Sequence, residues 1–192
     1  MNIYTISGSV IGFILYLCFA WQVRHHNLPL SMATFFLWAI LDTINAGSTY
    51  RTHGFWLLPA VYAFGGLLIC RELWLKRLIK WSWFESVISC LVLICIIGWA
   101  RSGDRTAIIL SGISVFLAGL PQCWDVFKEP AEQPLGLYSG FLISSGITMM
   151  GGTEWSVEQM MYSTLCFGIT ILVVVPLVYD RCKRKIPIRK WV

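Results

Sequence analysis

Asp42 is the only acidic residue well inside an apolar stretch of the chain. A charge at the centre of a bilayer costs about 2.5 kcal/mol or more, so an acid in a membrane helix faces the protein interior, is protonated or is paired. A carboxyl group in such a place can take up a proton or hold a cationic group. Asp42 is therefore the first candidate for chemistry in this chain.

Trp38 and Asn45 share one helical face with Asp42, because residues three and four apart lie on the same side of a helix. Asn45 can donate and accept hydrogen bonds, and Trp38 offers a flat aromatic surface. The whole stripe at this spacing is Ser31, Thr34, Trp38, Asp42, Asn45 and Thr49. An acid, an amide and an indole on one face predict a site for a small polar solute.

A structural interpretation of the same stripe is also open. Asp42 would then accept a hydrogen bond from Thr43 or Asn45, or pair with Arg51 beyond the helix end, and Trp38 would merely pack.

Thr148, in a later apolar stretch, would add a polar group to the predicted solute site from the second half of the chain. Threonines in membrane helices commonly bond to their own backbone, however.

Catalytic and metal-binding patterns are missing from the sequence. It contains no second acid well inside an apolar stretch, no HExxH motif, and no Ser/Lys or Cys/His pair that would share the work of catalysis. The seven cysteines form no CxxC motif and no Cys/His pair with metal-ligand spacing. We therefore expect no enzymatic activity, no metal site and no cofactor.

The elements that must position Asp42 are apolar helices. Apolar residues make up 57% of the 192 positions and charged residues 13%, a balance that suits a bilayer better than water. A helix needs about 20 apolar residues to cross a bilayer. Seven apolar stretches approach this length: 5–23, 29–50, 54–70, 84–100, 106–124, 134–152 and 157–179. We predict an all-α integral membrane protein with seven transmembrane helices, and loops too short for a soluble catalytic domain or a nucleic-acid-binding module.

The basic residues predict the orientation of these helices. With the N-terminus outside, 12 lysines and arginines fall on the cytoplasmic face and three, Arg51, Arg101 and Arg105, fall outside. The C-terminal tail, 181–192, is then cytoplasmic. We expect an integral multi-pass protein of the cell membrane, such as a bacterial inner membrane.

The chain also aligns with itself. A shift of 100 residues places the first apolar stretch on the fifth, with the matches Gly12 on Gly112, Leu17 on Leu117 and Gln22 on Gln122. A shift of 105 places the second stretch on the sixth, with Pro29 on Pro134 and Gly47 on Gly152 among the matches. We predict a first three-helix repeat at 1–80, a linker helix at 81–104, a second, parallel three-helix repeat at 105–180 and a basic tail at 181–192.

One segment resembles a known pattern. The stretch 119-GLPQCWDVFKEPAEQPLGLYSGFL-142 is similar to the PQ-loop motif, in which Pro-Gln ends a helix and a short polar loop leads into the next. The first half of the chain contains a weaker version of this motif, in which Trp21 replaces the proline before Gln22. Its sequence is 20-AWQVRHHNLPLSMATFFLWAILD-42. The three-plus-one-plus-three plan resembles a divergent member of the PQ-loop and SWEET superfamily over nearly the whole chain. That superfamily includes sugar, amino-acid and vitamin-precursor transporters and a retrieval receptor, so the resemblance names no substrate.

The resemblance gives Asp42 an expected role. Proton-coupled PQ-loop carriers use an acidic residue late in the second helix of a repeat, and Asp42 resembles it, whereas Ile147 stands there in the second repeat. We expect a transporter of a small polar solute that works by alternating access and couples to protons through Asp42. Its solute site would also include Trp38, Asn45 and Thr148. The alternative is a non-transporting membrane receptor or trafficking protein on the same fold.

Pro121 and Gln122 are the expected moving part. Pro121 removes a backbone donor near the cytoplasmic end of its helix, and Gln122 can bond to the groups this frees. We expect a hinge there, with Gln22 as the counterpart one repeat earlier. The expected partners are a small polar solute and membrane lipids, without nucleic acid, and the sequence leaves a homo-oligomer open.

Overall fold

The structure is a computed structural model that describes residues 2–26, 30, 32–77, 83–128, 130, 135–152 and 155–185. Within these ranges the chain forms seven α-helices, one π-helical segment and no strand. The helices are α1 (Ile3–His25), α2 (Met32–Arg51), α3 (Leu57–Leu75), α4 (Trp83–Ser102), α5 (Asp104–Lys128), α6 (Leu135–Met149), the π-helix η2 (Val157–Met161) and α7 (Tyr162–Lys183). The all-α prediction is confirmed for this part of the chain.

Four helical segments are long and apolar enough to cross a membrane: α1, α3, α4 and the continuous segment Val157–Lys183 of η2 and α7. The apolar helix α6 is shorter. The helices α2 and α5 are long, but they carry polar and charged residues such as Asp42 and Asp104. The four apolar segments indicate a helical membrane protein, and a bilayer crossing by α2, α5 and α6 stays a prediction.

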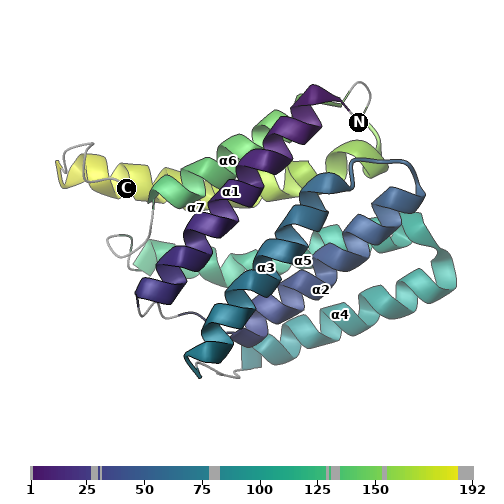
Figure 1. Ribbon diagram of the computed structural model, residues 1–192, viewed down its shortest axis with the longest axis horizontal. Coiled ribbons are helices and arrows are strands. Elements are labelled where there is room, and N and C mark those ends of the chain that lie inside the picture. Colours follow the sequence, from purple (N-terminus) through teal and green to yellow (C-terminus); the bar gives the residue numbers. More distant parts are fainter. Residues whose placement is uncertain are drawn as a thin grey trace.

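Six helices contact one another in a closed ring in the order α1, α3, α2, α5, α7 and α6, which we divide into the groups α1–α3 and α5–α7 of the predicted repeats, and α4 lies outside the ring (Figure 1). Helix α3 packs against both α1 and α2, and α7 packs against both α5 and α6. The two groups meet where α1 lies against α6 and where α2 lies against α5. Helix α4 packs against α2 and α5 and lies at the edge of the structure in Figure 1.

The contact between α1 and α6 is close because Gly8 has no side chain. A Cβ at Gly8 would lie 2.6 Å from the Ser144 carbonyl oxygen and would also clash with the Thr148 hydroxyl. Ser144 Oγ donates a 2.7 Å hydrogen bond to the Gly8 carbonyl. At the end of this contact, the Asn2 amide donates to the Gly151 carbonyl beyond α6. These contacts fix α1 against α6.

The largest core cluster crosses between the two groups of helices. Its buried members include Phe19 of α1, Phe35 of α2, Tyr62 of α3, Phe141 of α6 and Tyr162 of α7. The groups are therefore joined by aromatic packing as well as by backbone contact.

Helix α4 buries one face and exposes the rest. Glu85, in its first turn, is only 3% exposed, and its Oε1 accepts a 2.8 Å hydrogen bond from the Thr34 hydroxyl of α2. Ile88, Val92 and Cys95 continue the buried face. At Thr34, the polar stripe predicted on α2 therefore contacts α4.

Candidate functional site

A cavity of about 130 Å³ lies where α1, α2, α3, α5, α6 and α7 meet. Half of its 16 described lining residues are aromatic: Tyr16, Phe19, Phe35, Trp38, Tyr62, Tyr138, Phe141 and Tyr162. Along α2 the lining extends from Asp42 back to Trp38, Phe35 and, just before the helix, Leu30. The cavity therefore extends from Asp42 toward the end of the bundle where α2 and α6 begin.

Asp42 lies in this cavity with one strong hydrogen bond. Its side chain is largely buried, with the residue 5% exposed, and Oδ1 accepts a 2.6 Å hydrogen bond from the Tyr162 hydroxyl of α7. This bond joins the two groups of helices directly across the cavity. An ionised carboxylate accepts several hydrogen bonds, so the single tyrosine leaves much of its bonding capacity unused.

The residues that were alternative partners of Asp42 bond elsewhere. The Thr43 hydroxyl donates to the Ala39 carbonyl (2.7 Å) within α2. Arg51 Nε lies 3.2 Å from Asp104 Oδ2 at the start of α5. Asn45 also bonds to α5, as described below. In the described part of the chain, no hydrogen bond or ion pair joins Thr43, Arg51 or Asn45 to Asp42. None of the partners expected for a purely structural Asp42 is therefore present.

Tyr162 reaches Asp42 from the first residue after a π-helical turn. Ser156 caps this segment, and its Oγ accepts a 3.2 Å hydrogen bond from the Gln159 backbone. Residues Val157–Met161 then form η2, and α7 begins at Tyr162. A π turn holds an extra residue compared with an α turn, so it rotates the side chains that follow, and such turns are frequent at functional sites. The π turn sets the direction in which Tyr162 points.

Aromatic rings form the cavity wall in edge-to-face contact. The ring centroid of Tyr62 lies 5.3 Å from Tyr16, 5.6 Å from Phe141 and 6.1 Å from Tyr162. On the other side, Phe35 lies 5.4 Å from Trp38. These are favourable distances and angles for aromatic pairs, which makes the wall rigid.

Trp38 presents a free donor in this region. Its Nε1 is buried and has no hydrogen-bond partner among the described residues. A buried indole N–H ordinarily finds a partner, because leaving it unpaired costs about 1–3 kcal/mol. Trp38 and Asp42 together therefore offer a donor and an acceptor along the cavity.

Asn45 and Thr148 lie elsewhere. Asn45 is fully buried, and its Nδ2 donates to the Ser111 hydroxyl (2.9 Å) and to the Ile108 carbonyl (3.2 Å) of α5. The Thr148 hydroxyl donates to the Ser144 carbonyl (3.0 Å), in the contact with α1. Neither is among the described residues that line the cavity. The structure thus brings Asp42 and Trp38 together in the cavity, and places Asn45 and Thr148 in contacts between helices.

The expected hinge is described only in part. The backbone at Pro121 and Gln122 is helical and belongs to α5, but their side chains lie outside what the structure describes. Gln22 is half-buried in the last turn of α1, where its carbonyl accepts a 2.8 Å hydrogen bond from the His26 backbone. A role in bending stays a prediction for all three.

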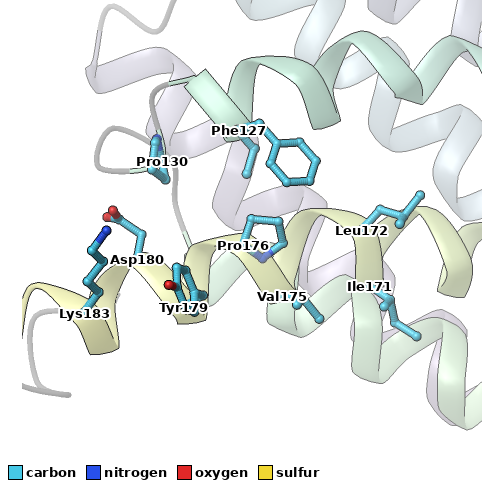
Figure 2. A pocket seen from close by; sticks show the side chains of 10 residues that line it. Phe127, Pro130, Ile171, Leu172, Val175, Pro176, Tyr179, Asp180 and Lys183 are labelled. Atoms are coloured by element: carbon cyan, nitrogen blue, oxygen red, sulfur yellow. The ribbon is translucent and has the colours of Figure 1, made fainter.

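A larger groove of about 580 Å³ lies between the ends of α5 and α7 (Figure 2). Its walls include the exposed side chains of Phe127, Val175 and Tyr179, and Asp180 and Lys183 lie together at one end. This groove is on the outer surface of the helices, where a membrane would place acyl chains. It offers no enclosed polar site.

The site can be interpreted only from this geometry. No family model matches the chain, and no curated protein or solved structure matches it either. No group of His, Cys, Asp and Glu side chains able to hold a metal occurs among the described residues.

The sequence did not single out Tyr162 or the other cavity tyrosines as functional. Tyrosine is common in membrane helices, and no spacing along the chain links Tyr162 to Asp42, which is 120 positions away. The capping pair Ser156 and Gln159 marks the start of the segment but not its π turn.

Proposed function

We propose that this protein transports a small polar solute across a membrane by alternating access, with the solute bound beside Asp42. The observation that carries the proposal is the cavity itself, which reaches the buried Asp42 carboxyl group and is walled by both groups of helices. Secondary transporters bind their solutes near the bilayer midplane, at the interface between repeated bundles.

The helix pairing supports a seven-span, PQ-loop- or SWEET-like plan with α4 as linker. Exchanging α1, α2 and α3 for α5, α6 and α7 leaves the main contacts unchanged: α1–α3 becomes α5–α7, α2–α3 becomes α6–α7, and α1–α6 becomes α5–α2. An internal two-fold repeat requires such a pattern, and many secondary transporters are built from repeated bundles that rock against each other.

Ion pairs support an assignment of the conformational state. At the end of the bundle opposite to Leu30, Arg51 pairs with Asp104 (3.2 Å) and Arg105 pairs with Glu158 of η2 (3.4 Å). These pairs tie α2, α5 and η2 together at that end. With the N-terminus outside, the ion pairs close the outer side and the cavity extends toward the cytoplasm, so we assign an inward-facing state.

The alternative of a receptor without transport has less support. A receptor needs no equivalence between two bundles, whereas alternating access uses it, and Asp42 lies at the junction of the two bundles. A bundle packed without a cavity around Trp38 and Tyr62 would have favoured it, but both residues line the cavity.

Proteoliposome uptake tests the proposal. We expect liposomes with the purified chain to accumulate at least one solute from a screen of sugars, amino acids, nucleosides and amines, above liposomes without protein. Asp42→Asn should abolish accumulation driven by a pH gradient. Asp180→Asn is the matched control, since Asp180 lies at the end of α7 and pairs there with Arg184 (2.9 Å). Transport is contradicted if no solute accumulates in vesicles with folded protein, and proton coupling is contradicted if Asp42→Asn leaves uptake unchanged across pH.

A further inference from the structure

We infer that the solute is a small organic cation, an ammonium ion held between the Asp42 carboxylate and the aromatic wall of the cavity. This inference rests on the proposed function and names the chemical class of its solute. It follows from the charge, the wall chemistry and the size of the cavity.

The cavity has one carboxyl group and no cationic side chain among its described lining residues, so Asp42 must be either protonated or paired with a bound cation. Asp42 is the one charged side chain among the described lining residues, which contain no Lys, Arg or His. Arg51, which the sequence offered as a cationic partner for Asp42, is exposed and pairs with Asp104 instead. A buried charge is stable when it is paired, and a bare carboxylate in a membrane protein is costly. A bound cation supplies the missing charge, and an anion would be repelled.

The aromatic wall suits the rest of such an ion. Aromatic faces attract organic cations, and rings arranged around an ammonium group are a common way to recognise it. Here Tyr62 packs edge-to-face on Tyr16, Phe141 and Tyr162, and Trp38 lies on α2 one turn from Asp42. Edge-to-face packing turns ring faces in several directions, so some can face a solute while others pack. A carboxylate beside ring faces is the arrangement that would hold an ammonium ion.

A sugar fits the lining less well. It would need many hydrogen-bond partners, but apart from aromatic side chains the described polar lining consists of Asp42, Cys166 and Thr170. The Thr170 hydroxyl already donates to the Cys166 carbonyl (2.8 Å) of its own helix. A sugar would therefore depend on the Trp38 N–H, the tyrosine hydroxyls and Asp42, and each of its hydroxyls that found no partner would cost binding energy.

The size limits the solute further. The cavity volume is about 130 Å³. Sites for drug-sized molecules measure about 300–1,000 Å³. The inferred solute is therefore a small alkylammonium or quaternary ammonium ion.

Binding of charged and uncharged isosteres tests the inference directly. The purified full-length chain in detergent is titrated with choline, tetramethylammonium and butylammonium, and with 3,3-dimethylbutan-1-ol, which has the shape of choline without its charge. Calorimetry measures each dissociation constant. We expect at least one ammonium ion to bind, and the tightest ion to bind about tenfold or more tightly than the neutral alcohol.

Two substitutions then locate the site. Asp42→Asn keeps the size of the side chain and should weaken ammonium binding about tenfold or more, whereas Asp180→Asn should leave it unchanged within about twofold. A thermal melt of each variant shows that it is folded. The inference is overturned if no ammonium ion binds the wild type, if the alcohol binds equally well, or if folded Asp42→Asn binds as the wild type does.

Uptake separates this inference from the proposed function. If an ammonium ion binds at Asp42 but does not enter proteoliposomes, the cation site stands and transport falls. If an uncharged solute enters and no ammonium ion binds or competes, transport stands and the cation inference falls.

Discussion

The Tyr162 hydroxyl donates a 2.6 Å hydrogen bond to Asp42 Oδ1, and this bond spans the cavity between α7 and α2. Both side chains are more than nine-tenths buried. A bond of this kind holds the two groups of helices together and orients the carboxyl group. Any solute or proton that binds to Asp42 changes the surroundings of the same bond, which links occupancy of the site to the contact between the bundles.

Tyr162→Phe should destabilise the protein, because the substitution removes the hydroxyl and leaves the buried Asp42 carboxyl group without its donor. Loss of a hydrogen bond to a buried charged group costs about 1–3 kcal/mol. Unfolding in detergent, followed by helical circular dichroism, measures the loss. Tyr62→Phe is the matched control, since no hydrogen bond joins the Tyr62 hydroxyl to Asp42 in the described structure. Equal stability of Tyr162→Phe and wild type would show that the bond contributes nothing.

Asn45→Leu should lower stability without changing solute binding. Asn45 Nδ2 bonds to Ser111 and Ile108 of α5, and its Oδ1 accepts a 3.3 Å hydrogen bond from Thr49. An apolar replacement removes these three bonds and deprives the buried Thr49 hydroxyl of this acceptor, although Ser111 keeps its bond to the Ala107 carbonyl (2.6 Å), and we expect a cost of about 1–3 kcal/mol in the free energy of unfolding. The dissociation constant of the tightest ammonium ion should stay within about twofold of wild type. A tenfold weaker affinity in folded protein would return Asn45 to the solute site predicted from the sequence.

The difference between Asn45 and Asp42 shows what the sequence can and cannot predict. Helical spacing correctly predicts that Trp38 and Asp42 share a face of α2, because that depends on neighbours along one helix. The spacing alone does not predict which neighbouring helix each side chain meets, so Thr34 faces α4, Asn45 faces α5, and Asp42 faces the cavity.

Contacts between distant segments were equally hard to predict. The apolar stretches predict the described helices to within several residues, since hydropathy is a local property. The aromatic wall brings together residues from five helices, and Tyr162 takes its direction from a π turn that has no distinct composition. Such features depend on tertiary packing, which a single sequence does not report.

Gly8→Ala should disrupt the contact between the two groups of helices. The new Cβ would lie 2.6 Å from the Ser144 carbonyl oxygen, and backbone atoms cannot yield as a flexible side chain does. Overpacking of this kind costs about 1–3 kcal/mol. Gly168→Ala in α7 is the matched control, because there the Cβ would meet its nearest neighbour, Phe116, at an ordinary 3.8 Å. Unfolding in detergent should show a lower free energy of unfolding for Gly8→Ala than for Gly168→Ala. The reverse order would mean that α1 and α6 are free to separate.

A pH gradient should drive uptake of the ammonium ion in one direction. A single carboxylate at Asp42 holds either a proton or a cation, so a transporter with this site exchanges one for the other. The titratable groups that face Asp42 among the described residues are Tyr16, Tyr62, Tyr162 and Cys166, and none supplies a second carboxylate.

In vesicles that are acidic inside, protons leave down their gradient and the cation enters. For one-for-one exchange, each pH unit supplies about 1.4 kcal/mol, which corresponds to about tenfold accumulation. Radiolabelled uptake of a quaternary ion such as tetramethylammonium measures it, because such an ion has no neutral form that could cross the lipid, and protein-free liposomes and a protonophore that collapses the gradient are the controls. Asp42→Asn should remove the response to the gradient. Accumulation driven instead by acid outside would mean that proton and cation move together, which one carboxylate does not permit.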